Sequence, residues 1–142
     1  MLDIVGSRTS RISHTTIDSR SAYQQSVWWA EVLAMREDPQ DPNEPGHQEC
    51  MIFSADGRTR LLFIEVPEGK QVKNRLHFDL RPTDRTREAE VSRLLGQGAT
   101  EVADYRRPDG SGWVTLADPD GNEFDVLRGD AEVSDPYAHL VA

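Results

Sequence analysis

The chain has 142 residues, of which 25 are acidic and 16 basic, and its net charge at pH 7 is −9. That length fits one domain that folds without disulfides or structural zinc, and the single cysteine excludes an intrachain disulfide. The negative charge argues against nucleic-acid and membrane partners, and the absence of a ~18-residue apolar run or a signal-peptide pattern predicts a cytoplasmic protein.

The first predicted elements are a strand and a helix. Apolar and polar residues alternate over residues 11–18, which predicts a strand that carries His14 on one face. A helix follows, because Ser21 and Gln24 have the spacing of a capping box and apolar residues then recur on one broad face. The adjacent tryptophans at 28–29 lie on that helix and are expected in the core or at a dimer interface.

A loop and a hairpin come next. Residues 38–47 contain three prolines and a glycine, which predicts a loop without regular structure. The apolar segments 49–54 and 59–66 flank the turn residues 55–57, which include an Asp-Gly pair. This pattern is typical of two antiparallel strands joined by a tight turn.

The same order of elements then recurs. A strand is predicted at 74–81 and a helix at 84–95 that ends at Gly96, and three more strands are predicted at 100–105, 112–116 and 122–127. The first strands of the two halves align through His14 and His77, which lie 63 positions apart. We therefore expect a single domain over 1–142 with two βαβββ modules, at about 11–68 and 74–128. The remaining tail, 129–142, has no clear period and is expected on the surface or against a partner.

Four motifs occur in an order that resembles a known superfamily. They are VWWAEVLAM, LLFIEVPEGKQVKNRLHFDL, LLGQGATEV and WVTLADPDGNEFDVL. The match covers about residues 11–128 and resembles the vicinal oxygen chelate superfamily, which includes glyoxalase I, fosfomycin- and bleomycin-resistance proteins and extradiol dioxygenases. Small glyoxalase-like domain proteins are the most similar members. The chain departs from them at Ala34, where a glycine is usual. The resemblance implies an α+β fold whose modules form a curved eight-stranded mixed sheet around a central cavity.

The resemblance also implies a metal site. His14, His77 and Asp125 occupy positions where metal-dependent members carry ligands, typically two histidines and a glutamate. Two imidazoles and a carboxylate suit one divalent ion of Fe, Mn, Ni, Co or Zn and leave positions where substrate oxygens bind. Here the carboxylate is an aspartate, which is one methylene shorter than glutamate.

Strand alternation predicts which other residues line the cavity. On the strand 74–81, the side chains of Arg75 and Asp79 are expected to face the cavity together with His77. Trp113, which follows a glycine-containing loop, is expected to form a cavity wall. The apolar residues of the strand 74–81 are expected to face the helix: Leu76, Phe78 and Leu80.

A fourth ligand of the glyoxalase I type is not expected. The aligned position at the end of the first module is Ile64, and Glu65 points to the opposite face. A slip of one residue in the strand register would turn Glu65 into the cavity, which keeps it as a reserve ligand.

The sequence leaves three functions open. In one of them the domain is only a scaffold with a vestigial cavity. The first is a metal-dependent enzyme of lyase, isomerase, transferase or dioxygenase type that acts on a small oxygen-bearing metabolite. The alternative is a metal-free protein that sequesters a small molecule, as bleomycin-resistance members do, with its acidic surface attracting a cationic drug. Because one fold hosts all these chemistries, the fold does not choose among them. Members of the superfamily often form homodimers, and the C-terminal tail would be available for such an interface, but the sequence does not set the oligomeric state.

Overall fold

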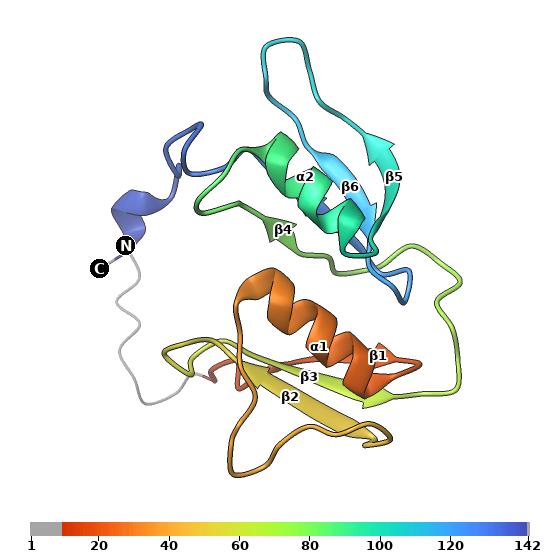
Figure 1. The fold of residues 1–142 in the computed structure, drawn as a ribbon. Coiled ribbons are helices and arrows are strands. Elements are labelled where there is room, and N and C mark those ends of the chain that lie inside the picture. Colours follow the sequence, from red (N-terminus) through yellow and green to blue (C-terminus); the bar gives the residue numbers. More distant parts are fainter. Residues whose placement is uncertain (1–9, 142) are drawn as a thin grey trace. The chain divides into compact units, whose positions relative to one another are not determined.

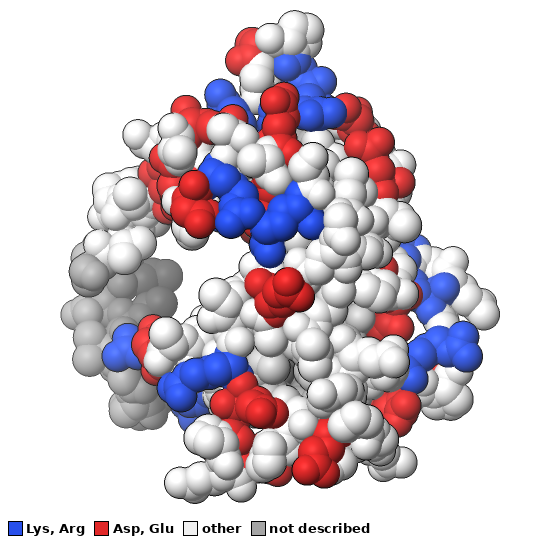
Figure 2. Space-filling view, in the orientation of Figure 1, with Lys and Arg blue, Asp and Glu red and all other residues white. Residues whose placement is uncertain are grey.

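The computed structural model describes residues 10–141, which form two compact units. Unit 1 ends at Glu68 and unit 2 begins at Gly69 (Figure 1). Within the described residues, no helix has the length and apolar character needed to cross a membrane. Figure 2 shows acidic and basic side chains interspersed over the face drawn there.

Unit 1 is a three-stranded sheet with one helix on it. Its elements are β1 (Thr15–Ser19), α1 (Ala22–Leu33), β2 (Glu49–Phe53) and β3 (Arg60–Glu65). The strand order is β1-β3-β2, with β1 parallel and β2 antiparallel to β3. The helix α1 packs on β2 and β3, and the core holds the buried side chains of Trp29, Cys50, Ile52, Leu61 and Phe63. Both tryptophans of α1 are buried.

A fourth strand of unit 1 is reduced to a single bridge. Arg36 and Phe53 exchange both backbone hydrogen bonds, at 2.9 and 2.7 Å, beside the edge strand β2. The next residues belong to the predicted loop, whose three prolines have no N–H to donate to a ladder. Pairing therefore stops after one residue pair, and the described part of unit 1 is βαββ rather than βαβββ.

The ends of α1 follow the sequence signals. The Ser21 side chain accepts a hydrogen bond from the backbone N–H of Gln24 at 3.4 Å, as the capping spacing predicted. At the other end, Ala34 has a left-handed backbone with φ of 52°. A Cβ atom is disfavoured there, which explains why glycine is the usual residue at such a helix end.

We expect Ala34→Gly to raise the free energy of unfolding by about 1 kcal/mol, because it relieves the left-handed strain. Urea unfolding followed by circular dichroism measures the change. The matched control is Ala30→Gly inside α1, where the same substitution should lower stability by about 1 kcal/mol. Equal losses in the two variants would contradict the strain at Ala34.

Unit 2 is a four-stranded sheet with one helix on it. Its elements are β4 (Asp79–Leu80), α2 (Arg87–Gly96), β5 (Thr100–Asp104), β6 (Val114–Ala117) and β7 (Glu123–Val126), followed by a short 3₁₀ helix, Ala138–Leu140. The order is β4-β7-β6-β5, in which only the β4–β7 pair is parallel. The core is made of the buried side chains of Val91, Leu94, Val114, Leu116, Phe124 and Val126.

The strand β4 is shorter than predicted. It lies at the sheet edge, where the amides of Asp125 in β7 and of Leu127 just after β7 donate to the carbonyls of Phe78 and Leu80. Residues before Phe78 are not held in the ladder, and Leu76 is 86% exposed. The prediction that Leu76 faces the helix is therefore wrong.

The first part of the C-terminal tail packs on its own unit. The Asp130 amide donates to Pro82 O at 2.8 Å, and Glu132 accepts from the amides of Arg87 and Gly129 at 2.6 and 2.8 Å. Glu132 thereby bonds an amide in the first turn of α2, where negative charge is favoured. In Figure 1 the blue tail runs beside the loop between β4 and α2.

The α+β class is confirmed by these elements. The described residues form two mixed sheets, of three and four strands, and two α-helices. The single curved sheet of eight strands around a cavity stays a prediction.

Candidate metal centre

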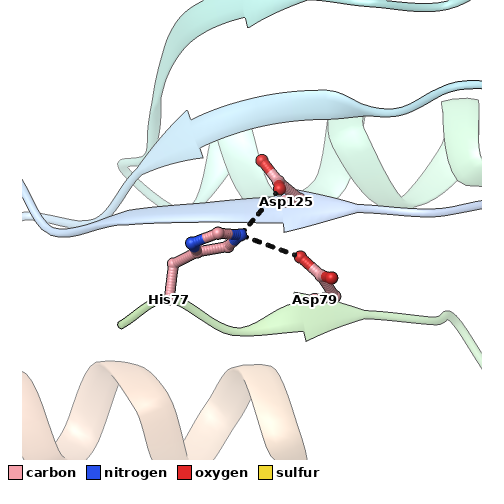
Figure 3. A group of neighbouring side chains, drawn as sticks. All are labelled: His77, Asp79 and Asp125. Carbon is pink, nitrogen blue, oxygen red and sulfur yellow. Dashed lines mark ion pairs between the residues drawn. The ribbon is translucent and has the colours of Figure 1, made fainter. Parts of the chain in front are cut away.

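Three potential ligands of a metal ion meet on one face of unit 2. Asp79 and Asp125 are direct partners in the parallel β4–β7 register, so their side chains leave the sheet on the same side. His77 lies two residues before Asp79 and reaches the same side (Figure 3). Its Nε2 atom is 3.4 Å from Asp79 Oδ1 and 3.2 Å from Asp125 Oδ2. One ligand atom from each residue lies within 4.8 Å of the others.

The strand β7 fixes the position of Asp125. Its neighbours Phe124 and Val126 are 1% and 0% exposed and fill the core, which turns Asp125 to the opposite face. There the hydroxyl of Thr115, the partner residue on β6, donates to Asp125 Oδ1 at 2.6 Å. The second oxygen, Oδ2, is the one near His77. A ligating carboxylate is commonly oriented by such a hydrogen bond.

The cluster concentrates negative charge. Burial, followed by hydrogen bonding to Asp125 and by its charge, raises the pKa of Asp79, while His77 acts in the opposite direction. Two carboxylates directly opposite each other on neighbouring strands repel. Their arrangement is stabilised by whatever brings positive charge between them: a proton, a protonated His77 or a metal cation.

We expect Asp79→Asn to stabilise the metal-free protein at pH 7 by a few tenths of a kcal/mol, because it removes this repulsion. The pKa of Asp79 is raised in the folded protein, so the wild type gains stability as pH falls through that pKa. The difference between wild type and variant should therefore shrink toward the ordinary aspartate pKa of 3.8. Urea unfolding at a series of pH values measures it.

The matched control for this experiment is Asp109→Asn. A hydrogen bond from Ser111 lowers the pKa of Asp109, so its removal should reduce stability at pH 7, with the opposite sign. A destabilised Asp79→Asn protein at pH 7 would contradict the repulsion.

The donor set and its spacing fit a divalent metal ion. Imidazole nitrogen and carboxylate oxygen suit Mn, Fe, Co, Ni and Zn. Two ligand atoms at about 2.1 Å from one ion lie roughly 3.0–3.4 Å apart at tetrahedral or octahedral angles, close to the distances from His77 to the two carboxylates. The side chains of His77, Asp79 and Asp125 are 40%, 55% and 14% exposed, which leaves room for a further ligand.

The other predicted site residues are His14 in unit 1 and Arg75 and Trp113 in unit 2. His14 belongs to unit 1, directly before β1, where it is exposed and its Nδ1 is 3.0 Å from Ser13 Oγ. Its role as a ligand stays a prediction. Arg75 is exposed, and its place in a cavity wall stays a prediction. Trp113 is half-buried, with its ring centroid 5.2 Å from that of Tyr105.

Asp79 has a different place in the candidate site from the one predicted. It was expected in the cavity wall, yet the structure places it beside His77 and Asp125 as a third potential ligand. The signal was present, because a histidine and an aspartate two positions apart on a strand share one face.

The register of β3 places Glu65 away from the predicted ligand face. Glu65 alternates with Leu61 and Phe63, which are buried in the unit 1 core. Burial raises the pKa of the Cys50 thiol, and the charge of Glu65 adds to that shift, which agrees with Glu65 lying toward this core. The slip that would turn Glu65 over is not seen in the described strand.

Comparison with known proteins identifies the family and the fold. The family profile described as "Glyoxalase-like domain" matches residues 14–127. No functionally curated protein sequence is significantly similar to the chain. Solved structures with the same fold come from several bacteria, and three of them are described next.

A mutant of the fosfomycin resistance protein FosX from Listeria monocytogenes, complexed with Mn(II) and 1S,2S-dihydroxypropylphosphonic acid, is 16% identical. The match covers 85% of this chain and 91% of that one, with a TM-score of 0.64. A glyoxalase/bleomycin resistance protein/dioxygenase family enzyme from Burkholderia phytofirmans is 20% identical over 82% and 97% of the chains, with a TM-score of 0.59. A possible glyoxalase from Bacillus cereus is 15% identical over 84% and 99%, with a TM-score of 0.57. At these identities the structures show a shared fold.

Proposed function

The chain belongs to the glyoxalase-like domain family, and we propose that it is a metal-dependent enzyme acting on a small oxygen-bearing metabolite. The observation that carries this proposal is the convergence of His77, Asp79 and Asp125 on one face of unit 2. The fold neighbour from Listeria supports it, because that structure contains Mn(II) together with a compound that has two adjacent hydroxyl groups.

Each residue of the cluster has a distinct part in this proposal. His77 offers an imidazole nitrogen and Asp125 a carboxylate oxygen, which Thr115 orients. Asp79, whose pKa is raised and whose side chain is the most exposed of the three, is placed to ligate or to hold a proton near the substrate. A divalent ion bound here supplies Lewis-acid polarisation of substrate oxygens.

The finer features that the family resemblance implies belong to the same proposal. They are His14 as the second histidine ligand, the curved eight-stranded sheet around a cavity that includes Arg75 and Trp113, and a cytoplasmic homodimer. The reaction type, whether lyase, isomerase, transferase or dioxygenase, is set by the substrate and by the metal.

The test uses untagged full-length protein reconstituted with Fe, Mn, Ni, Co or Zn and analysed for metal content. The loaded protein is then assayed with small diols, epoxides, hydroxyketones and catechols, with and without a chelator. We expect one ion per chain and chelator-sensitive turnover of one of these classes. Failure to retain any of the metals would contradict the proposal.

The alternative is a metal-free binding protein of the bleomycin-resistance type. The net charge of −9 and the two paired carboxylates favour a cationic ligand for such a protein. In that case ligand affinity falls with added salt and is unchanged by chelators. A chelator therefore abolishes turnover if the protein is the enzyme and leaves ligand affinity unchanged if it is the binding protein.

A further inference from the structure

A small cavity in unit 2 combines basic side chains with the C-terminal segment. It has a volume of about 230 Å³, and its lining includes Arg81, Arg128, Ser111 and Ser134 together with Val133 and Pro136 of the tail. This volume is below the roughly 300–1,000 Å³ of pockets for drug-sized ligands. The cavity therefore suits a small group rather than a whole cofactor.

The two arginines both line this cavity, and the charge of Arg128 also acts on the carboxyl groups of Asp109 and Glu132. Arg81 Nη1 donates to the backbone O of Arg128 at 2.7 Å, which holds the two residues together. None of the ion pairs found among residues 10–141 involves either guanidinium. Two guanidinium groups without an ion pair therefore line one cavity of a chain whose net charge is −9.

The surrounding loop is fixed by a third arginine. Arg87 is 5% exposed and donates to Gly112 O at 2.9 Å and to Gly110 O at 3.1 Å. A Cβ atom on Gly110 would lie 3.7 Å from Arg128 Nη1, so that guanidinium lies against this loop. The buried Arg87 therefore holds the loop against which Arg128 lies.

A carboxyl group, that of Glu132, lies next to this part of the chain. Backbone hydrogen bonds, first from Gly129 and then from Arg87, lower the pKa of Glu132, and the charges of Arg87 and Arg128 act in the same direction. The hydroxyl of Ser111 is already engaged with Asp109. The hydroxyl of Ser134 has no partner among the described residues and can donate to a ligand.

We propose that this cavity binds an oxyanion group, such as a phosphate, phosphonate or carboxylate, through Arg81, Arg128 and Ser134. The planar forks of two guanidinium groups match the oxygens of such groups, and charge-assisted hydrogen bonds provide the affinity. The anion site uses none of His77, Asp79 and Asp125. The test of this site is therefore independent of the test of the proposed enzyme. The anion is either a free ion or the acidic group of a larger small molecule.

The experiment titrates chelator-treated, full-length protein with inorganic phosphate, methylphosphonate and acetate at constant ionic strength. The ¹⁵N NMR signals of the arginine Nε–H groups report binding, and chloride serves as the blank. We expect saturable shifts at Arg81 and Arg128 with at least one of the three anions. Arg81→Gln and Arg128→Gln should each weaken binding at least about tenfold, the loss of one charge-assisted hydrogen bond.

The charge-matched control is Arg58→Gln, in the exposed hairpin turn of unit 1, which should leave the affinity unchanged. His77→Ala should also leave it unchanged. Saturation by phosphate but not by methylphosphonate or acetate supports a free-ion site, whereas binding of the organic anions supports an acidic group on a larger ligand. Shifts that chloride reproduces, or equal affinities in wild type and both arginine variants, would overturn the proposal.

Discussion

His77→Ala is expected to lower the affinity of the protein for Mn(II) by at least about 100-fold. Loss of an outer-shell partner alone typically lowers metal affinity 10–100-fold, and His77 is the residue that lies between both carboxylates. Its side chain is 40% exposed, so truncation should leave the fold intact. Isothermal titration calorimetry on the untagged protein measures the affinity, and circular dichroism checks the fold.

The matched control is His47→Ala. That histidine is also exposed and also faces a carboxylate, Glu44, at 3.7 Å, but among residues 10–141 it forms no ion pair with a second acidic residue. Its loss should leave Mn(II) affinity unchanged. A third variant, His14→Ala, tests the ligand that the family resemblance implies: a loss comparable to that of His77→Ala would support His14 as a ligand. Equal affinities in wild type and His77→Ala would exclude the cluster as the metal site.

Gly112→Ala is expected to destabilise the protein by roughly 2–5 kcal/mol. Gly112 has a φ of +90°, and an added Cβ would lie 2.0 Å from the carbonyl oxygen of Tyr105. The left-handed backbone contributes about 1–2 kcal/mol of this and the forced shift of packed backbone about 1–3 kcal/mol. β6 starts two residues after Gly112 and carries Thr115, whose hydroxyl orients the potential metal ligand Asp125. We therefore also expect weaker metal binding in Gly112→Ala.

Gly110→Ala in the same loop separates the two contributions. Gly110 has a φ of +89°, yet the nearest atom to an added Cβ is 3.7 Å away. The free energy of unfolding of Gly110→Ala should therefore fall by only about 1–2 kcal/mol, which is the backbone contribution. Urea unfolding of both variants gives the comparison. A Gly112→Ala protein no less stable than Gly110→Ala would contradict the close approach of Gly112 to Tyr105.

Periodicity and local signals predicted most of the elements. The capping pair Ser21 and Gln24 correctly placed the start of α1, and the prolines after Arg36 explain why the outer strand of unit 1 is a single bridge. These features depend on residues close in sequence. The length of β4 could not be predicted this way, because it depends on which carbonyls the distant strand β7 reaches.

In the candidate site, too, features set by residues close in sequence were predicted and features set by distant strands were not. Alternation along one strand predicted that His77 and Asp79 share a face, and burial of Phe124 and Val126 agrees with the predicted orientation of Asp125. The register that sets Asp79 opposite Asp125 joins strands more than 40 residues apart in the chain, and no local pattern encodes it. The Arg81–Arg128 cavity arises in the same way, from tail residues that the sequence analysis left without a fixed position.

Pulsed EPR of Mn(II) bound to the protein tests the central claim most directly, because it detects a nitrogen bonded to the metal. We predict a ¹⁴N coupling of the size given by a ligating imidazole, which changes when histidine is labelled with ¹⁵N and is weakened or lost in His77→Ala. A spectrum without nitrogen coupling, or a coupling left unaltered in His77→Ala, would contradict the assignment of His77, Asp79 and Asp125 as the metal centre.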